Sequence, residues 1–474
     1  MRFSHELNRM IGLVLVAFAI VALAAAYWAV TGPDTLLSRD DNPRLVEDAI
    51  RIQRGAIIDR RGNLLAESIP DEQGIITRAY RTPELASATG YFSFRYGVSG
   101  AEAAYDDILS GATHPPDIGT LLLHQPRVGD DIQLAFDLDV QLAIVEAMGD
   151  QQGAVVVLAV PSGDVLALVS LPTYNPNTLD ADWNELIQDA GKPFFNRVLQ
   201  GSYQPGGLLQ TPLLAAALAN NQSLDVPLGN ATASVEIESI VLHCLGLPVV
   251  QAMTLAEAYS HTCPAPFAML VNTLGQDTVQ AVFDNFELAQ PPTLPGFVPE
   301  PEDGAATPVS PTRQARADFL ETALGQGDLT VNPLQMALIA AAVINDGNAP
   351  QPNTLLAVRT PGTEQWTRQR AIRPSLPFTT SATATRLQAI MLEAVQNGAA
   401  QAASRPEMTI GGHVALAYSG DGTQAWFIGF TPPDSGSGIA VAVVLEHSDD
   451  TGLAASIGGT ALASALVALG DGGD

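Results

Sequence analysis

The chain has 474 residues, 47% of them hydrophobic and 15% charged, which is enough length and apolar content for two or three folded domains. The 50 acidic residues outnumber the 22 basic ones and give a formal net charge of −28. This balance argues against nucleic acid as a partner, because phosphate binding requires lysine and arginine. Lys192 is the single lysine in the sequence, so any mechanism that needs a lysine base has one candidate.

Residues 11–30 form an uncharged apolar run of twenty residues. At about 1.5 Å per residue, such a helix spans a hydrocarbon core of about 30 Å. Arg2 and Arg9 precede the run, and basic residues favour the cytoplasmic side of a membrane. We therefore expect a cytoplasmic tail at 1–10, one transmembrane helix, and the bulk of the chain outside the cytoplasm. A cleaved signal peptide is the alternative.

The region after the apolar run begins with a strand-like pattern, and residues 74–136 have a mixed pattern that predicts an α+β region. A strand-like alternation leads to a turn at Arg61-Gly62-Asn63 and resumes at Leu64, which is typical of a β-hairpin. From residue 74 onward, glycine, tyrosine and serine are frequent, and no internal repeat is found in the sequence.

From residue 137 onward, helical and strand patterns alternate. Asp137 predicts the N-cap of a helix over 138–148, and two apolar runs joined by Pro161-Ser162-Gly163 predict a buried antiparallel hairpin. Because strands from both ends of this region must share one sheet, we expect an antiparallel sheet sandwiched by helices. The proline-rich stretch 290–312 predicts a surface loop. The other expected elements are helices at about 207–220, 332–346, 384–398 and 452–469, and strands at 424–430 and 438–447.

The sequence contains two cysteines, Cys244 and Cys263. Outside the cytoplasm they can form a disulfide. They also have the neighbours His243 and His261, which makes a zinc site an alternative, and free buried thiols are a third. The spacing lacks the usual zinc-site pattern, so no metal or cofactor is expected, but the sequence leaves these three states open.

Five blocks of sequence resemble, in order, those of the class B penicillin-binding proteins. They are Arg54–Ala66, Ala88–Gly111, Gly153–Asn177, Ala323–Gly347 and Ala425–Pro432. The resemblance covers nearly the whole chain. It implies a single-pass protein of the bacterial cell membrane with an elongated pedestal (dimerisation-like) domain at 31–136. It also implies an α+β transpeptidase domain with the serine β-lactamase-like fold at 137–474. The implied role is in peptidoglycan (cell wall) assembly, with a multi-spanning glycan polymerase as a partner in the membrane.

Catalysis in that family uses three motifs, Ser-x-x-Lys, Ser-x-Asn and Lys-Thr-Gly. Each motif position can be found in this sequence, and each is changed. Gly207 and Gln210 replace the first serine and lysine, Thr262 and Pro264 replace Ser-x-Asn, and His413, Val414 and Ala415 replace Lys-Thr-Gly. A register shifted by two residues would begin the second motif at Ser260 instead.

These changes remove the chemistry that the family needs. Glycine has no side chain to acylate, and a glutamine is neutral and cannot serve as a base. The sequence therefore predicts a catalytically inactive, transpeptidase-like scaffold or regulator. Two alternatives stay open: an active acyl-transfer enzyme with Thr262 or Cys263 as relocated nucleophile, and a non-covalent sensor of muropeptides or β-lactams. His413 is either a polar residue of an edge strand or, if charged, a cation for a carboxylate.

Overall fold

The computed structural model describes residues 2–32, 52–70, 76–113, 127–237, 240–246, 252–297, 316–369, 374–420, 422–433 and 437–470. Most of the predicted loop at 290–312 lies outside these residues. The chain divides into two units, which are described separately. One comprises residues 1–53, 69–77 and 114–128, and the other comprises residues 54–68, 78–113 and 129–474.

The first unit contains helix α1, Arg2–Gly32, which includes the apolar run predicted at 11–30. Its stretch Asn8–Tyr27 has a mean hydropathy of 2.6, and none of it is buried. In length and composition this helix can cross a membrane. Among the described residues one other helix meets the same criteria, α16 (Thr451–Gly470), but half of that stretch is buried in the protein, as expected of a core helix.

The second unit is built on a five-stranded antiparallel sheet in the order β17-β18-β19-β7-β8. Strands from both ends of the region share this sheet, as the sequence predicts. All residues of β7 and β8 are buried, because helices cover both faces of the sheet. The strands are β7 (Gly153–Val160), β8 (Val165–Leu171), β17 (Gly411–Ser419), β18 (Gly422–Thr431) and β19 (Gly438–Glu446).

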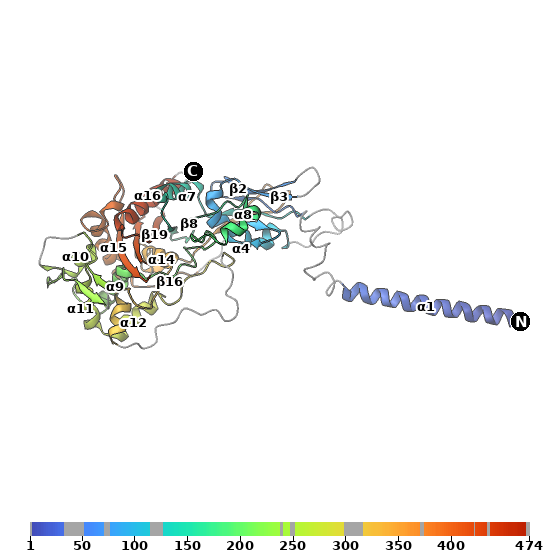
Figure 1. Ribbon diagram of the computed structural model, residues 1–474, viewed down its shortest axis with the longest axis horizontal. Helices are drawn as coiled ribbons and strands as arrows, with labels where there is room; N and C mark the ends of the chain where they lie inside the picture. Colours follow the sequence, from blue (N-terminus) through green and yellow to red (C-terminus); the bar gives the residue numbers. More distant parts are fainter. Residues whose placement is uncertain are drawn as a thin grey trace. The chain divides into compact units, whose positions relative to one another are not determined.

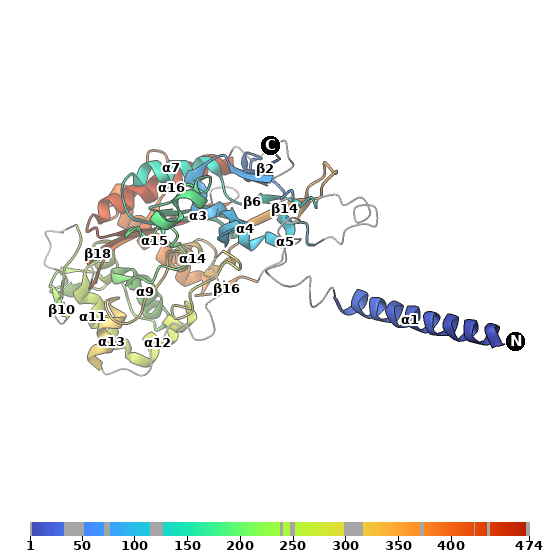
Figure 2. The same cartoon turned by 45° about the vertical axis from the view of Figure 1, so that its right-hand side comes forward.

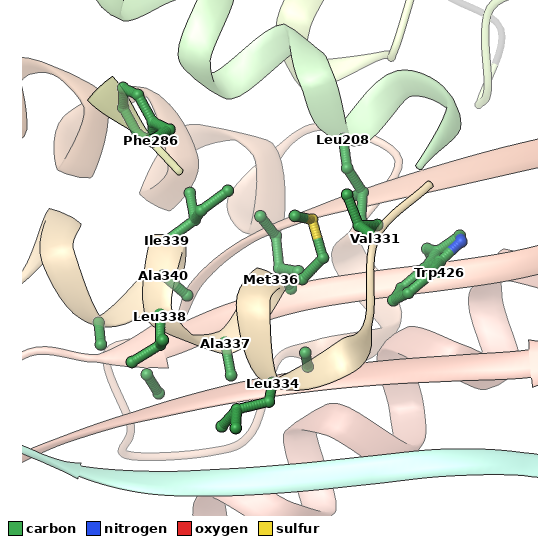
Figure 3. Close-up of a cluster of buried hydrophobic side chains, with 14 of the residues drawn as sticks. Leu208, Phe286, Val331, Leu334, Met336, Ala337, Leu338, Ile339, Ala340 and Trp426 are labelled. Carbon is green, nitrogen blue, oxygen red and sulfur yellow. The ribbon is translucent and has the colours of Figure 1, made fainter. Parts of the chain in front are cut away.

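Helices α7 (Leu138–Met148) and α16 pack together on one face of this sheet (Figures 1 and 2). Asp137 caps α7 as predicted, accepting hydrogen bonds from the backbone N–H groups of Asp139 and Val140 at 3.1 and 3.3 Å. The other face is covered mainly by α14 (Pro333–Val343), every residue of which is buried. Figure 3 shows its apolar side chains beside Leu208 and Trp426, so this helix packs against the chain segment that contains Leu208.

A second sheet has the order β15-β14-β6-β1-β2-β3. The predicted hairpin is confirmed by β1 (Ile57–Ile58) and β2 (Leu64–Pro70), which pair antiparallel around the turn. Strand β6 (Asp131–Leu134) lies between β1 and β14 (Leu355–Arg359) and pairs with both. The sheet therefore takes strands from both sides of the boundary expected near residue 136. Its edge strands are β3 (Ile76–Tyr80) and β15 (Thr367–Arg368).

The remaining elements connect these layers. The helices are η2 (Pro83–Leu85), α3 (Ala86–Thr89), α4 (Gly100–Ala104), α5 (Asp106–Leu109), α8 (Leu179–Leu186), η3 (Gly206–Leu209), α9 (Gln210–Ala219), α10 (Leu255–Ser260), α11 (Pro264–Leu274), α12 (Gln276–Asn285), α13 (Arg316–Ala323), α15 (Ser381–Gln396) and η4 (Gln401–Ala403). The short strands are β4 (Phe92–Ser93), β5 (Gly97–Val98), β9 (Leu228–Gly229), β10 (Val235–Ile237), β11 (Ile240–Leu242), β12 (Ala252–Met253), β13 (Asn348–Ala349) and β16 (Leu376–Pro377).

Candidate functional site

The first turn of the helix predicted at 207–220 is the 3₁₀ turn η3, after which α9 continues as an α-helix. Gly206 begins this turn with φ +53°, and its N–H donates to the carbonyl of Gly325 at 2.9 Å. A side chain on Gly325 would collide with the backbone of Gly206. The two glycines therefore allow the backbones of Gly206 and Gly325 to lie in close contact where the chain enters η3, next to edge strand β17.

Gly207 is the residue predicted at the position of the family's serine, and the space for a side chain there is already filled. A Cβ atom on Gly207 would come closer than 3.0 Å to the Cγ2 methyl of Thr262. Its next neighbours, Ala415 Cβ at 3.6 Å and Gln210 Nε2 at 3.7 Å, are at ordinary contact distances. One atom, the threonine methyl, is therefore the obstacle to a serine at this position.

Thr262 lies in the turn between α10 and α11. Its φ is +50°, a left-handed value that is rare for a β-branched residue. Its hydroxyl donates to the carbonyl of Val414 at 2.9 Å, and its N–H donates to the carbonyl of Tyr259 at 2.9 Å. The side chain is buried. A hydroxyl held as a donor to a backbone carbonyl has no base at that contact to remove its proton.

Cys263 forms a disulfide with Cys244. Of the three states that the sequence left open, the structure contains this one, so neither cysteine carries a free thiol. No group of three or more potential metal-ligating His, Cys, Asp or Glu side chains occurs among the described residues. Ser260, the start of the shifted register, donates its hydroxyl to the carbonyl of Ala256 at 3.3 Å, within its own helix.

His413 is buried in β17, and its ring stacks on Tyr259 at a centroid distance of 3.9 Å. Its Nε2 donates to the carbonyl of Gly207 at 3.1 Å, which places the proton of the neutral ring on Nε2. Burial lowers the pKa of His413 to about 3, and it outweighs the contact with the Gly207 carbonyl, which acts in the opposite direction. The ring is therefore neutral at pH 7 and offers no positive charge to a carboxylate.

Gln210, the residue predicted at the lysine position, lies in the first turn of α9 and is buried. Its Nε2 lies 3.5 Å from the carbonyl of Cys263, a long hydrogen bond. Its Oε1 is buried and has no hydrogen-bond partner among the described residues. At the predicted lysine position the structure therefore has a neutral amide whose oxygen has no partner among the described residues.

Four of the predicted motif positions line one cavity of about 60 Å³, which we call the motif cavity: Gly207, Gln210, Thr262 and Pro264. His413, Val414 and Ala415 do not line it, although His413 contacts Gly207 and Val414 contacts Thr262. The structure adds lining residues that the sequence did not single out, notably Gln326, Leu416 and Tyr418. Gln326 lies in the block Ala323–Gly347, one of the five blocks that resemble the family, and this resemblance is the sequence signal for it.

This architecture, an antiparallel sheet between helices with a helix starting below its edge strand, defines a penicillin-binding transpeptidase fold. Residues 153–463 match the family model described as the penicillin binding protein transpeptidase domain. Residues 54–120 match the penicillin binding protein A dimerisation domain. The chain therefore belongs to the class B penicillin-binding protein family, whose members act in peptidoglycan synthesis.

Similar proteins support this placement. The peptidoglycan D,D-transpeptidase PbpA of Mycobacterium tuberculosis is 30% identical, covering 98% of this chain and 99% of that protein. The peptidoglycan D,D-transpeptidase MrdA of Acinetobacter baumannii is 25% identical, covering 76% of this chain and 59% of that protein. A structure of penicillin-binding protein A from M. tuberculosis as an imipenem acyl-enzyme complex is 28% identical, with a TM-score of 0.74. It covers 89% of this chain and 99% of that one.

Proposed function

We propose that this chain is a membrane-anchored, catalytically silent member of its family that acts as a scaffold or regulator in peptidoglycan assembly. In this proposal α1 crosses the membrane with residues 1–10 in the cytoplasm. Residues 31–136 form the pedestal, and 137–474 form the transpeptidase-like domain. The observation that carries the proposal is the position of Gly207, where the nucleophile is missing and the Thr262 methyl fills its place.

Acyl transfer needs a hydroxyl or thiol next to a base. Gly207 supplies no nucleophile, and Gln210 supplies no base. Neither relocated candidate is free to replace them, because Thr262 donates its hydroxyl to Val414 and Cys263 is in a disulfide. Losing nucleophile and base together removes on the order of 10⁶-fold of rate in a comparable hydrolase. These facts favour the silent form over an active enzyme with a relocated nucleophile.

The part of the site that would anchor a carboxylate is also changed. The family's Lys-Thr-Gly lysine is replaced by His413, which is buried and uncharged at neutral pH. A substrate that ends in a carboxylate would therefore find no cation at this position. This second loss is independent of the missing nucleophile and supports the same conclusion.

In this proposal the protein is useful without catalysis because it binds other proteins. We expect the partner to be a multi-spanning glycan polymerase of the same membrane, contacted through α1 and the pedestal. Affinity capture of the full-length protein from solubilised membranes tests this expectation. Recovery of a peptidoglycan polymerase with the wild type, and its loss when α1 is replaced by an unrelated transmembrane helix, is the expected result.

A gel assay with a fluorescent penicillin tests the absence of catalysis directly. The full-length protein is incubated with the label beside PbpA of M. tuberculosis, for which β-lactam acyl-enzyme structures exist. We expect a covalent band on PbpA and none on this chain. A covalent band on this chain that persists after denaturation would overturn the proposal.

A further inference from the structure

A second cavity, of about 180 Å³, lies within the second unit and shares no lining residue with the motif cavity. Its walls come mainly from two segments, 86–100 and 170–200. We call it the aromatic cavity, because its lining includes the aromatic side chains of Tyr91, Tyr174, Phe194, Phe195 and Phe297. The proposed function uses none of these residues.

Three of the rings hold one another in place. The ring centroids of Tyr174 and Phe194 are 4.8 Å apart, and each lies 5.9 Å from the centroid of Tyr91. The rings are tilted against one another by 57° to 76°, which brings ring edges toward ring faces, as aromatic side chains prefer. Trp183, which does not line the cavity, packs on Phe194 at 5.0 Å. The aromatic wall is therefore already formed before a ligand arrives.

The aromatic cavity also carries two polar groups without a hydrogen-bond partner among the described residues. Tyr91 is 8% exposed, and its hydroxyl is one of these groups. The hydroxyl is not among the fully enclosed atoms of the described chain, so it keeps a surface that a ligand can reach. Gln200 is exposed and accepts the backbone N–H of Asn196 with its Oε1 at 2.8 Å, which leaves its Nε2 as the other group. Burial raises the pKa of Tyr91, so both groups are hydrogen-bond donors at pH 7.

The lining restricts the ligand by charge and by size. None of the described lining residues is a lysine, an arginine, an aspartate or a glutamate, so a charged ligand would be buried unpaired. The volume is that of roughly six water molecules at about 30 Å³ each, which is room for one sugar-sized ring. Rigid aromatic faces suit the C–H face of such a ring, and hydroxyl and amide donors suit its oxygen atoms.

We propose that the aromatic cavity binds an uncharged N-acetylated sugar unit of a glycan strand. The C–H face of the sugar packs on the aromatic wall, the Tyr91 hydroxyl bonds to a sugar hydroxyl, and Gln200 Nε2 donates to the acetamide carbonyl. In a peptidoglycan strand every second sugar has this chemistry, and the sugars between them carry the peptides. The choice of ligand rests on the proposed function in peptidoglycan assembly, and it gives the scaffold a direct contact with the glycan.

Three matched trisaccharides test the chemistry of the ligand. N,N′,N″-triacetylchitotriose has the acetamides, cellotriose has hydroxyls in their place, and chitotriose has charged amines there. Each is titrated into the full-length protein in nanodiscs and followed by ligand-observed NMR. We expect the acetylated sugar to bind about fivefold more tightly than either of the others, the effect of one lost hydrogen bond.

The controls decide between recognition and general attraction. No binding of triacetylchitotriose, or equal binding of cellotriose, overturns the inference. Equal or tighter binding of chitotriose overturns it as well, because this result is expected from attraction to the formal charge of −28 alone.

Two variants locate the binding. Tyr91→Phe removes the unpartnered hydroxyl and keeps the ring, and Gln200→Ala removes an exposed amide, so both variants should fold. Each should weaken the binding of triacetylchitotriose about fivefold. The matched controls are Tyr96→Phe and Gln188→Ala, because these residues lie in the same two segments but do not line the cavity. Thermal unfolding checks each variant. A folded Tyr91→Phe or Gln200→Ala protein that binds like the wild type refutes the assignment, as does an equal loss in the controls.

The penicillin gel keeps the two proposals apart. A covalent adduct on this chain removes the catalytically silent role but leaves glycan binding in place, because the two cavities share no residue. The absence of an adduct together with no binding of triacetylchitotriose removes this inference alone and leaves the silent scaffold in place.

Discussion

The contact between Gly207 and Thr262 predicts a strong coupling between two small substitutions. Gly207→Ala adds only a Cβ, and its single close neighbour is Thr262 Cγ2. Overpacking of this kind costs about 1–3 kcal/mol of unfolding free energy. Thr262→Ser deletes that methyl and keeps the hydroxyl that bonds to Val414, so by itself it should cost about 0.5–1.5 kcal/mol.

In the Thr262→Ser background, the added Cβ meets neighbours at 3.6 Å or more, so Gly207→Ala should be nearly neutral. Any remaining effect should be a gain of about 0.4–1 kcal/mol, because alanine restricts the unfolded chain more than glycine does. The double-mutant cycle should therefore show a coupling energy of about 1–3 kcal/mol. Urea unfolding of the four proteins, followed by circular dichroism, measures it.

A matched control is Gly229→Ala, where a Cβ meets nothing within 4 Å. Its effect should add to that of Thr262→Ser within about 0.5 kcal/mol. If Gly207→Ala and Thr262→Ser are additive to the same degree, the Thr262 methyl does not fill the place of the nucleophile, and the reasoning behind the silent site fails.

Three further predictions concern buried groups. The pKa of His413 is lowered to about 3 in the folded protein, against an ordinary value of 6.5. As the pH falls, the unfolded chain therefore binds a proton at this histidine before the folded protein does. The wild type should lose unfolding free energy relative to His413→Gln below pH 6.5. This loss of unfolding free energy should reach about 2 kcal/mol at pH 5. Urea unfolding of the wild type and of His413→Gln at several pH values measures it, and a difference between the two proteins that does not change with pH contradicts it. Glu102→Gln should lower the unfolding free energy by about 3–5 kcal/mol, because the two arginines it contacts are buried with it; a urea midpoint close to the wild type would show otherwise. Replacing Cys244 by alanine should cost about 3 kcal/mol, since the disulfide spans 19 residues of sequence, and equal melting temperatures with and without reductant would argue against that bond.

Local patterns in the sequence were sufficient for much of the fold. The Asp137 cap, the buried hairpin of β7 and β8 and the final helix α16 follow from side-chain periodicity and turn residues, and the structure has them within a few residues of the expected bounds. The pairing of β14 with β6 could not be predicted this way. Its partner lies more than 200 residues away, and no local pattern encodes which edge a short strand joins.

For the candidate site too, the sequence predicts some features, and only the structure shows the others. The sequence predicts Gly207, Gln210 and Thr262 as motif positions from their resemblance to the family, and the structure brings these three residues to one cavity. The filling of the serine position by a threonine methyl depends on the positive φ of Thr262, a tertiary feature that the sequence does not reveal. The same is true of His413, whose neutrality results from complete burial against Tyr259.

The position of β14 has a consequence for the order in which the chain can fold. The polypeptide is made from its N-terminus, and β6 is complete long before Leu355–Arg359 exist. Until that later segment arrives, β6 presents one unpaired edge, which is a template for wrong pairing. A chain released at residue 136 should therefore aggregate on its own, and be rescued when residues 137–474 are supplied with it.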